Sequence, residues 1–147
     1  MSEIVKLPSS VLFVCTVNSV RSAMAEGILK KLHGERIYVD SAGLRVGDQN
    51  GYMIEVMAEI DIDLSNHQSK AIGSLNDTSF DVIISLSPEA QSAAVELTRW
   101  MSCEVAYWPT LDPDAIRGRR DSRLVGFREI RDDLVDKIRT KFPSNTE

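Results

Sequence analysis

Cysteine, histidine and long apolar runs are scarce in this chain of 147 residues. The only two cysteines, Cys15 and Cys103, cannot form a disulfide framework, and with only His33 and His67 beside them they match no structural zinc pattern. The longest strongly apolar run, residues 11–17, is far shorter than the roughly 20 residues that span a bilayer. The sequence therefore predicts neither a structural metal nor a membrane segment.

Basic residues are also fewer than acidic ones. The chain has 17 Lys and Arg against 22 Asp and Glu, a formal net charge of -5, which argues against a broad surface for nucleic acid or an anionic membrane. The first apolar run does not form a signal peptide, because Glu3 and Pro8 precede it and Asn18 and Arg21 follow it. We expect a cytoplasmic protein with, at most, a local basic site.

The remaining composition is that of an ordinary globular protein, with 43% hydrophobic and 27% charged residues. At a prior of roughly 150 residues per domain, the length allows one domain. No repeat, low-complexity tract or linker divides the chain. We therefore expect a single domain over residues 1–147, with its core at about 10–142.

Apolar runs typical of buried strands alternate with segments of helical period. The expected strands comprise residues 11–15, 36–39, 81–86 and 103–108. The expected helices comprise residues 22–34, 51–60, 88–100 and 123–142, with a short helix within 65–78 and a long loop over 109–121. This alternation predicts an α/β fold, a mostly parallel sheet with helices on both faces.

Ligands of such sheets bind outside the carboxyl ends of the strands. Cys15 ends the first expected strand and Ser41 follows the second. Ser85 and Ser87 end the third, and Asp112 follows the fourth. Because parallel strands share one carboxyl edge, the sequence predicts a functional site there.

The richest cluster at this edge is residues 15–22, CTVNSVRS, a strand running into a loop that opens a helix. Backbone N–H groups that turn inward, the helix N-terminus and the Arg21 guanidinium would form a cradle for a tetrahedral oxyanion. The positive potential of the helix N-terminus and of Arg21 also lowers the pKa of a nearby thiol to roughly 3.5–7.5. We therefore expect Cys15 to be a thiolate at neutral pH. Such a nucleophile favours phosphoryl transfer through a phosphocysteine. The alternative is a small apolar residue at a buried strand end.

Cys15 and Arg21 form a Cys-x5-Arg loop that continues as RSAMAE, and this pattern resembles the low-molecular-weight protein tyrosine phosphatase family with its arsenate reductase relatives. Further blocks stand in the family's order: DSAG at 40–43, HQSK at 67–70, Asp112-Pro113, and REIRDDL at 128–134. The resemblance covers nearly the whole chain. It implies a flavodoxin-like α/β domain, a four-stranded parallel sheet with helices on both faces.

The resemblance also implies roles for particular residues. Cys15 would be the nucleophile, Arg21 would hold the transition state, and Asp112 would protonate the leaving group and then activate water. The substrate-binding loop would comprise Thr16, Val17, Asn18, Ser19, Val20 and Ser22, and a supporting polar network would add Ser41 and His67. No metal or other cofactor is implied, since the loop amides and Arg21 neutralise the oxyanion. Taken alone, Asp112 before Pro113 fits a turn residue equally well.

Several positions depart from the family pattern. Val17 stands where a glycine is usual, and Val20 replaces the second loop cysteine of many relatives. Asp114 stands where members that act on phosphotyrosine tend to have tyrosine. Four nearby arginines form either a solvated loop or a surface that steers an anionic substrate: Arg117, Arg119, Arg120 and Arg123.

Three functions remain open from the sequence. The favoured one is a metal-independent cysteine phosphatase that acts on a small phosphomonoester or a phosphorylated protein, including phosphotyrosine. The second is an arsenate reductase, which needs a resolving thiol, whereas Ser87 occupies the end of the third strand. The third is a catalytically weak module that binds oxyanions or phosphoproteins. In each case we expect phosphate, sulfate and arsenate as ligands or inhibitors.

Overall fold

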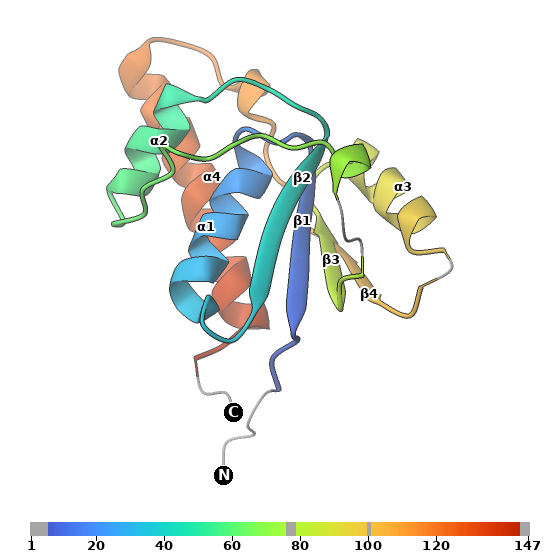
Figure 1. The fold of residues 1–147 in the computed structure, drawn as a ribbon. Helices are drawn as coiled ribbons and strands as arrows, with labels where there is room; N and C mark the ends of the chain where they lie inside the picture. The colour runs from blue at the N-terminus through green and yellow to red at the C-terminus, as the bar shows by residue number, and fades with distance from the viewer. Residues whose placement is uncertain (1–5, 76–78, 100, 145–147) are drawn as a thin grey trace.

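A computed structural model describes residues 6–75, 79–99 and 101–144. Four parallel strands form one sheet in the order β2-β1-β3-β4 (Figure 1). The strands are β1 (Ser10–Val17), β2 (Tyr38–Arg45), β3 (Val82–Ser85) and β4 (Glu104–Tyr107). The α-helices are α1 (Arg21–His33), α2 (Gly51–Ala58), α3 (Pro88–Leu97) and α4 (Arg120–Lys141), with 3-10 turns η1 (Ile72–Ser74) and η2 (Pro113–Ala115). The predicted fold class is confirmed.

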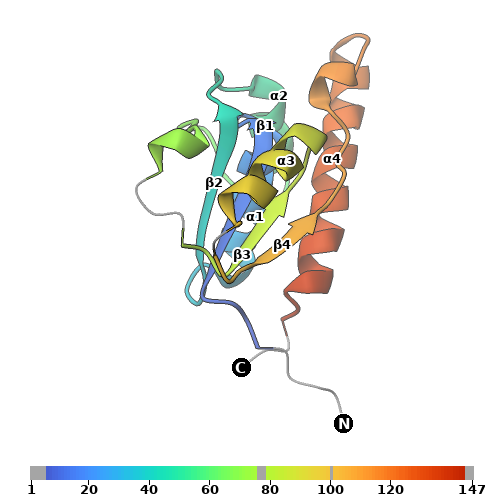
Figure 2. The ribbon, with the colours of Figure 1, turned by 90° about the vertical axis from the view of Figure 1, so that its right-hand side faces the viewer.

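Helices cover both faces of the sheet, as Figures 1 and 2 show. Alternation along β1 explains the two layers, because successive side chains of a strand point to opposite faces. Val11, Phe13 and Cys15 belong to the larger core cluster, which includes α1, α2 and α4. Leu12 and Val14 belong to the smaller cluster beneath α3. Cys15 therefore lies on the face that α1 and α4 cover.

β1 and β2 are longer than the sequence predicts, and the extension reaches the loop after Cys15. Cys15 pairs with Gly43, and Val17 pairs with Arg45. A Cβ atom on Gly43 would lie 2.5 Å from the backbone nitrogen of Asn18, so only glycine permits this close approach. The pairing therefore brings Arg45 beside the loop, although the second predicted strand ended at residue 39.

The helices begin and end within a few residues of the predictions. The largest differences are three residues: α4 begins at Arg120 and not at residue 123, and α3 ends at Leu97 and not at residue 100. The short helix predicted within residues 65–78 corresponds, among the described residues, to the 3-10 turn η1. The predicted end of the third helix, Trp100, lies outside them.

Salt bridges join α2 to α4. The carboxylate of Glu59 accepts hydrogen bonds from Arg128 and Arg131, with the shortest N–O distances 2.8 and 2.7 Å. These bonds hold the pKa of Glu59 at about 2, below its ordinary value of 4.5. Within the described residues, no helix is long and apolar enough to cross a membrane.

Candidate active site

Cys15 lies at the end of the buried part of β1, and its side chain is inaccessible to solvent. Its Sγ lies 2.8 Å from the hydroxyl oxygen of Ser22 in the first turn of α1. The Asn18 side-chain amide donates to the same hydroxyl at 2.6 Å. Because Ser22 accepts this bond, its single O–H is free to donate to sulfur. The arrangement supplies the sulfur atom with a hydrogen-bond donor that stabilises a thiolate.

The backbone of the loop is not arranged as the sequence predicted. The carbonyl oxygen of Val17 lies 2.9 Å from Cys15 Sγ and accepts its hydrogen bond. The backbone N–H of Ser19 donates to the same carbonyl, and that of Asn18 is directed to the carbonyl of Arg45. These two N–H groups therefore do not turn inward. The physical reason is that Val17 remains in the β1 ladder opposite Arg45, an extended conformation that a β-branched residue favours.

The expectation of a neutral-pH thiolate is also not met in this arrangement. Burial raises the pKa of the Cys15 thiol above its ordinary value, and this outweighs the lowering by hydrogen bonds from Ser22 and by the charge of Arg21. The carbonyl oxygen of Val17 accepts a hydrogen bond that only the protonated thiol can donate. In this arrangement the protonated thiol is therefore the favoured form of Cys15.

Arg21 connects the loop to the segment that carries Asp112. Its side chain is buried, and its guanidinium donates to the carbonyl oxygen of Thr110 at 3.3 Å. Asp112 is exposed and caps η2 by accepting the backbone N–H of Asp114 at 2.9 Å. The turn role that the Asp-Pro pair allows is thus present. It does not exclude an acid–base role, because the second carboxylate oxygen is not used by the cap.

The supporting network comes together around Asn18. Its amide nitrogen donates to Ser41 at 3.0 Å, and its side-chain oxygen accepts the backbone N–H of Lys70 at 3.0 Å. The His67 ring lies 3.2 Å from the Asn18 carbonyl oxygen. Ser41 in turn donates to the carboxylate of Glu26, a residue that the sequence analysis did not assign to the network. Nothing in the sequence around this acidic residue of α1 indicates a contact with β2.

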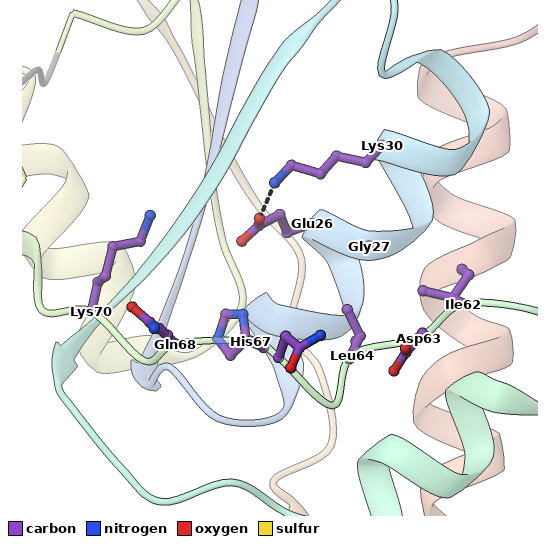
Figure 3. A pocket seen from close by; sticks show the side chains of 10 residues that line it. Glu26, Gly27, Lys30, Ile62, Asp63, Leu64, His67, Gln68 and Lys70 are labelled. Atoms are coloured by element: carbon purple, nitrogen blue, oxygen red, sulfur yellow. Dashed lines mark hydrogen bonds and ion pairs between the residues drawn. The ribbon is translucent and has the colours of Figure 1, made fainter.

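A small cavity of about 510 Å³ borders this network on the side of α1 (Figure 3). Glu26 and Lys30 form an ion pair on its wall, while His67 and Lys70 line it from the segment after α2. The Lys70 ammonium binds the carboxylate of Asp40. No residue of the loop 15–22 lines this cavity.

The main cavity lies in front of the loop and measures about 960 Å³. Arg21 and Asp112 both line it, as do Thr16, Val17, Ser19 and Val20 from the predicted substrate loop. A helix or strand pattern does not reveal which residues face a cavity, and several lining residues were therefore not predicted from the sequence. They include Arg45, Asn50, Tyr52, Pro88, Glu89, Thr110 and Phe127. The guanidinium of Arg21 and the carboxylate of Asp112 thus share one cavity, whereas Cys15 is buried beneath the loop and does not line it.

Cys103, the other cysteine, lies far from this opening. Through the strand register, Val14 is level with Ser85 of β3, and Ser85 is level with Tyr107 of β4. Cys103 precedes β4, so it is about 16 Å along the strand and about 10 Å across two strands from Cys15, or roughly 19 Å in all. A disulfide needs Cα atoms within about 7 Å. The two thiols are free and cannot pair in this fold.

Comparison with known proteins identifies the family. Residues 10–141 match the model described as low molecular weight phosphotyrosine protein phosphatase. The chain belongs to this family. The family resemblance found in the sequence is therefore confirmed. Five residues of the Cys-x5-Arg loop of this family member line the main cavity, namely Thr16, Val17, Ser19, Val20 and Arg21.

Among curated relatives of this family member, the arsenate reductase of Oceanobacillus iheyensis is 32% identical over 127 residues, which cover 86% of this chain and 90% of the relative. The glutaredoxin arsenate reductase of Synechocystis sp. is 34% identical over 129 residues, which cover 87% and 92%. A solved structure described as an arsenate reductase in the phosphate binding state has a TM-score of 0.71 at 31% identity, and covers 90% of this chain and 95% of that one.

Proposed function

We propose that this protein reduces arsenate through a covalent adduct on Cys15, with the reducing thiol supplied by a second molecule. The observation that carries the covalent step is the buried Cys15 thiol, hydrogen-bonded to Ser22 beside the cavity that Arg21 lines. Arsenate is favoured over a phosphomonoester because several relatives at 30–35% identity are arsenate reductases. The alternative that the sequence analysis ranked second is therefore preferred here.

The reaction balances with two external thiols. The Cys15 thiolate attacks arsenic(V), an S–As bond forms, and one arsenate oxygen leaves as water. An external thiol then attacks Cys15 Sγ; the S–As bond breaks, its electron pair stays on arsenic, and arsenite leaves. A second thiol attacks the resulting mixed disulfide and restores Cys15, so two thiols become one disulfide as arsenic gains two electrons.

The positions of the two cysteines support the proposal of an external thiol. Cys103 lies roughly 19 Å from Cys15 by strand register and spacing. At the end of β3, Ser87 caps α3 by accepting the N–H of Ala90 and lies 2.9 Å from the Thr16 hydroxyl. A serine there cannot form a disulfide. The chain therefore contains no thiol that could resolve the adduct.

Hydrolysis of phosphomonoesters is the second candidate, and one observation favours it. Asp112 lines the same cavity as Arg21, so a carboxyl group is available to protonate a leaving oxygen and then to activate water. The same Cys15 nucleophile would form a phosphocysteine, which water hydrolyses. Reduction of arsenate by external thiol does not need this second, hydrolytic step.

One experiment separates the two functions. The protein is incubated with arsenate and either glutathione or a dithiol, and arsenite is quantified; parallel reactions contain p-nitrophenyl phosphate and a chelator. We expect arsenite formation that requires both thiol and Cys15, so that Cys15→Ser abolishes it while phosphate binding stays measurable. Cys103→Ser serves as the matched control and should retain full activity.

The outcomes are distinct. Aryl phosphate turnover without arsenite formation at any thiol concentration would make the protein a phosphatase and refute the reductase proposal. Loss of arsenite formation in Cys103→Ser would show that the second cysteine takes part, against the strand register. Unchanged turnover in Cys15→Ser would remove the covalent step from both candidates.

A further inference from the structure

We propose that Arg45, Arg117 and Arg123 form a second anion subsite, which binds a carboxylate on the molecule that reacts beside the Cys15 loop. The inference rests on the proposed function, because it assigns the chemistry of the second reactant. All three arginines line the main cavity together with Arg21. They come from three separate segments, namely the end of β2, the turn after η2, and the first turn of α4.

The size of the cavity is the first argument. Cavities of roughly 300–1,000 Å³ enclose ligands of drug size. The main cavity measures about 960 Å³, whereas arsenate has only five heavy atoms. The oxyanion therefore occupies one end of the cavity, and the remaining volume is open to a larger organic molecule.

The second argument is that two of these guanidiniums are held in place by backbone carbonyls. Arg117 donates to the carbonyl oxygen of Asp114 at 2.6 Å, and Arg123 donates to that of Gly118 at 3.0 Å. Arg123 also lies over the Tyr52 ring, 6.0 Å from its centroid. A guanidinium has five N–H donors, so each keeps donors for a ligand after these contacts. Because they are pre-positioned, less side-chain entropy is lost on binding.

The third argument concerns the charged groups that line the cavity. In the part of the chain that the structure describes, no salt bridge involves Arg45, Arg117 or Arg123. Arg120 in the same segment differs, because both of its terminal nitrogens bind the carboxylate of Glu55. The carboxylates that line the cavity, Glu89, Asp112 and Asp114, are fewer than its four arginines.

Guanidinium groups are matched to carboxylates, which they bind in a planar, two-bonded geometry. For the reductase, such a carboxylate would be part of a small acidic thiol. For the phosphomonoesterase, it would be part of the leaving group. Both sources present the same chemistry, a carboxylate a few bonds away from the reacting atom, and the experiment distinguishes them.

The first arm of the test measures the thiol. Arsenate reduction is followed with glutathione, which carries two carboxylates, and with its diethyl ester, which carries none but has the same thiol. We expect a KM for glutathione about tenfold lower than for the ester, the size of one charge-assisted contact. In the double variant Arg117→Gln/Arg123→Gln the two values should converge. The difference should also shrink as ionic strength rises.

The second arm measures binding without turnover. Calorimetry with the Cys15→Ser protein compares 3-carboxyphenyl phosphate with phenyl phosphate, before and after the double arginine change. A preference of about tenfold that disappears in the double variant supports the subsite with the carboxylate on a leaving group. A preference confined to the glutathione arm supports it with the carboxylate on the thiol. Arg139→Ala on α4, outside the cavity lining, is the matched control and should keep each preference.

Two results overturn the inference. One is the absence of any preference for the charged compound in both arms; the other is a preference that survives the double variant. If no thiol yields arsenite, the proposed reductase function fails, and the calorimetric arm still decides the subsite by itself.

Discussion

The Cys15 thiol donates a hydrogen bond to the carbonyl oxygen of Val17, its neighbour two residues along the chain, at 2.9 Å. A carbonyl oxygen in this position repels an oxyanion that approaches the sulfur. Oxyanion binding must therefore turn the Val17 peptide away, which breaks the pairing of Val17 with Arg45. The free energy needed for this rearrangement weakens the apparent affinity for the anion.

Val17→Gly should strengthen oxyanion binding. Glycine lacks the strand preference of valine and adopts positive φ freely, and β-propensities span about 1 kcal/mol, so we expect roughly a fivefold lower Kd for phosphate or arsenate. Calorimetric titration of each anion measures it. Val17→Ile keeps the β-branch and is the control, with little change expected. Weaker binding in the glycine variant would contradict this. It would show that the packing of the Val17 side chain against Gly47 contributes more to anion affinity than a flexible backbone does.

The reactivity of Cys15 should rise with pH over an alkaline range when no anion is bound. Burial raises its pKa above the ordinary value of 9.0, so at about pH 7 nearly all of it is the unreactive thiol, and the thiolate increases only as pH rises through and beyond 9. Alkylation rates by iodoacetamide across pH measure this. Ser22→Ala removes a hydrogen bond that lowers the pKa, and should shift the profile further to high pH. A plateau already reached near neutral pH would contradict this.

Asp112 should matter for hydrolysis in proportion to how poor the leaving group is. A nitrophenolate departs with little protonation, whereas an alkyl oxygen needs the proton in the transition state. We expect Asp112→Asn to lose about 10²–10⁴-fold in kcat with poor leaving groups, and less with p-nitrophenyl phosphate. Asp114→Asn is the control, since Asp114 lines the same cavity. The larger loss in that variant would move the acid role to Asp114.

Glu59 should contribute stability that is lost in acid. Its pKa is lowered from 4.5 to about 2 by Arg128 and Arg131, so the stabilisation is present above pH 4.5 and is lost as the pH falls toward 2. Glu59→Gln should lower Tm by roughly 2 °C near neutral pH, and by progressively less below 4.5. Glu96→Gln, which removes an exposed pair with Arg99, should change Tm little. Equal losses at neutral and acidic pH would exclude the charge as the cause.

The sequence by itself determined the fold class and the position of the Cys-x5-Arg loop at the carboxyl edge of the sheet. The alternation of apolar runs and helical segments specifies a parallel sheet, and a parallel sheet brings Cys15 and Asp112 to one edge. Ser41, predicted to follow the second strand, lies instead within β2, level with Phe13. The Cys-x5-Arg spacing likewise specifies the loop at the start of α1. These features depend on chain order and periodicity, which a sequence contains in full.

The tertiary structure alone decided the state of the thiol and the charge of the cavity. The pKa of Cys15 depends on how completely the sheet and α1 bury its sulfur, and the direction of the Val17 carbonyl depends on pairing with Arg45, 28 residues later in the chain. Arg120 and Arg123 look alike in sequence, yet one is neutralised by Glu55 on α2 and the other lines the cavity. Such differences come from contacts between distant segments, which local pattern does not encode.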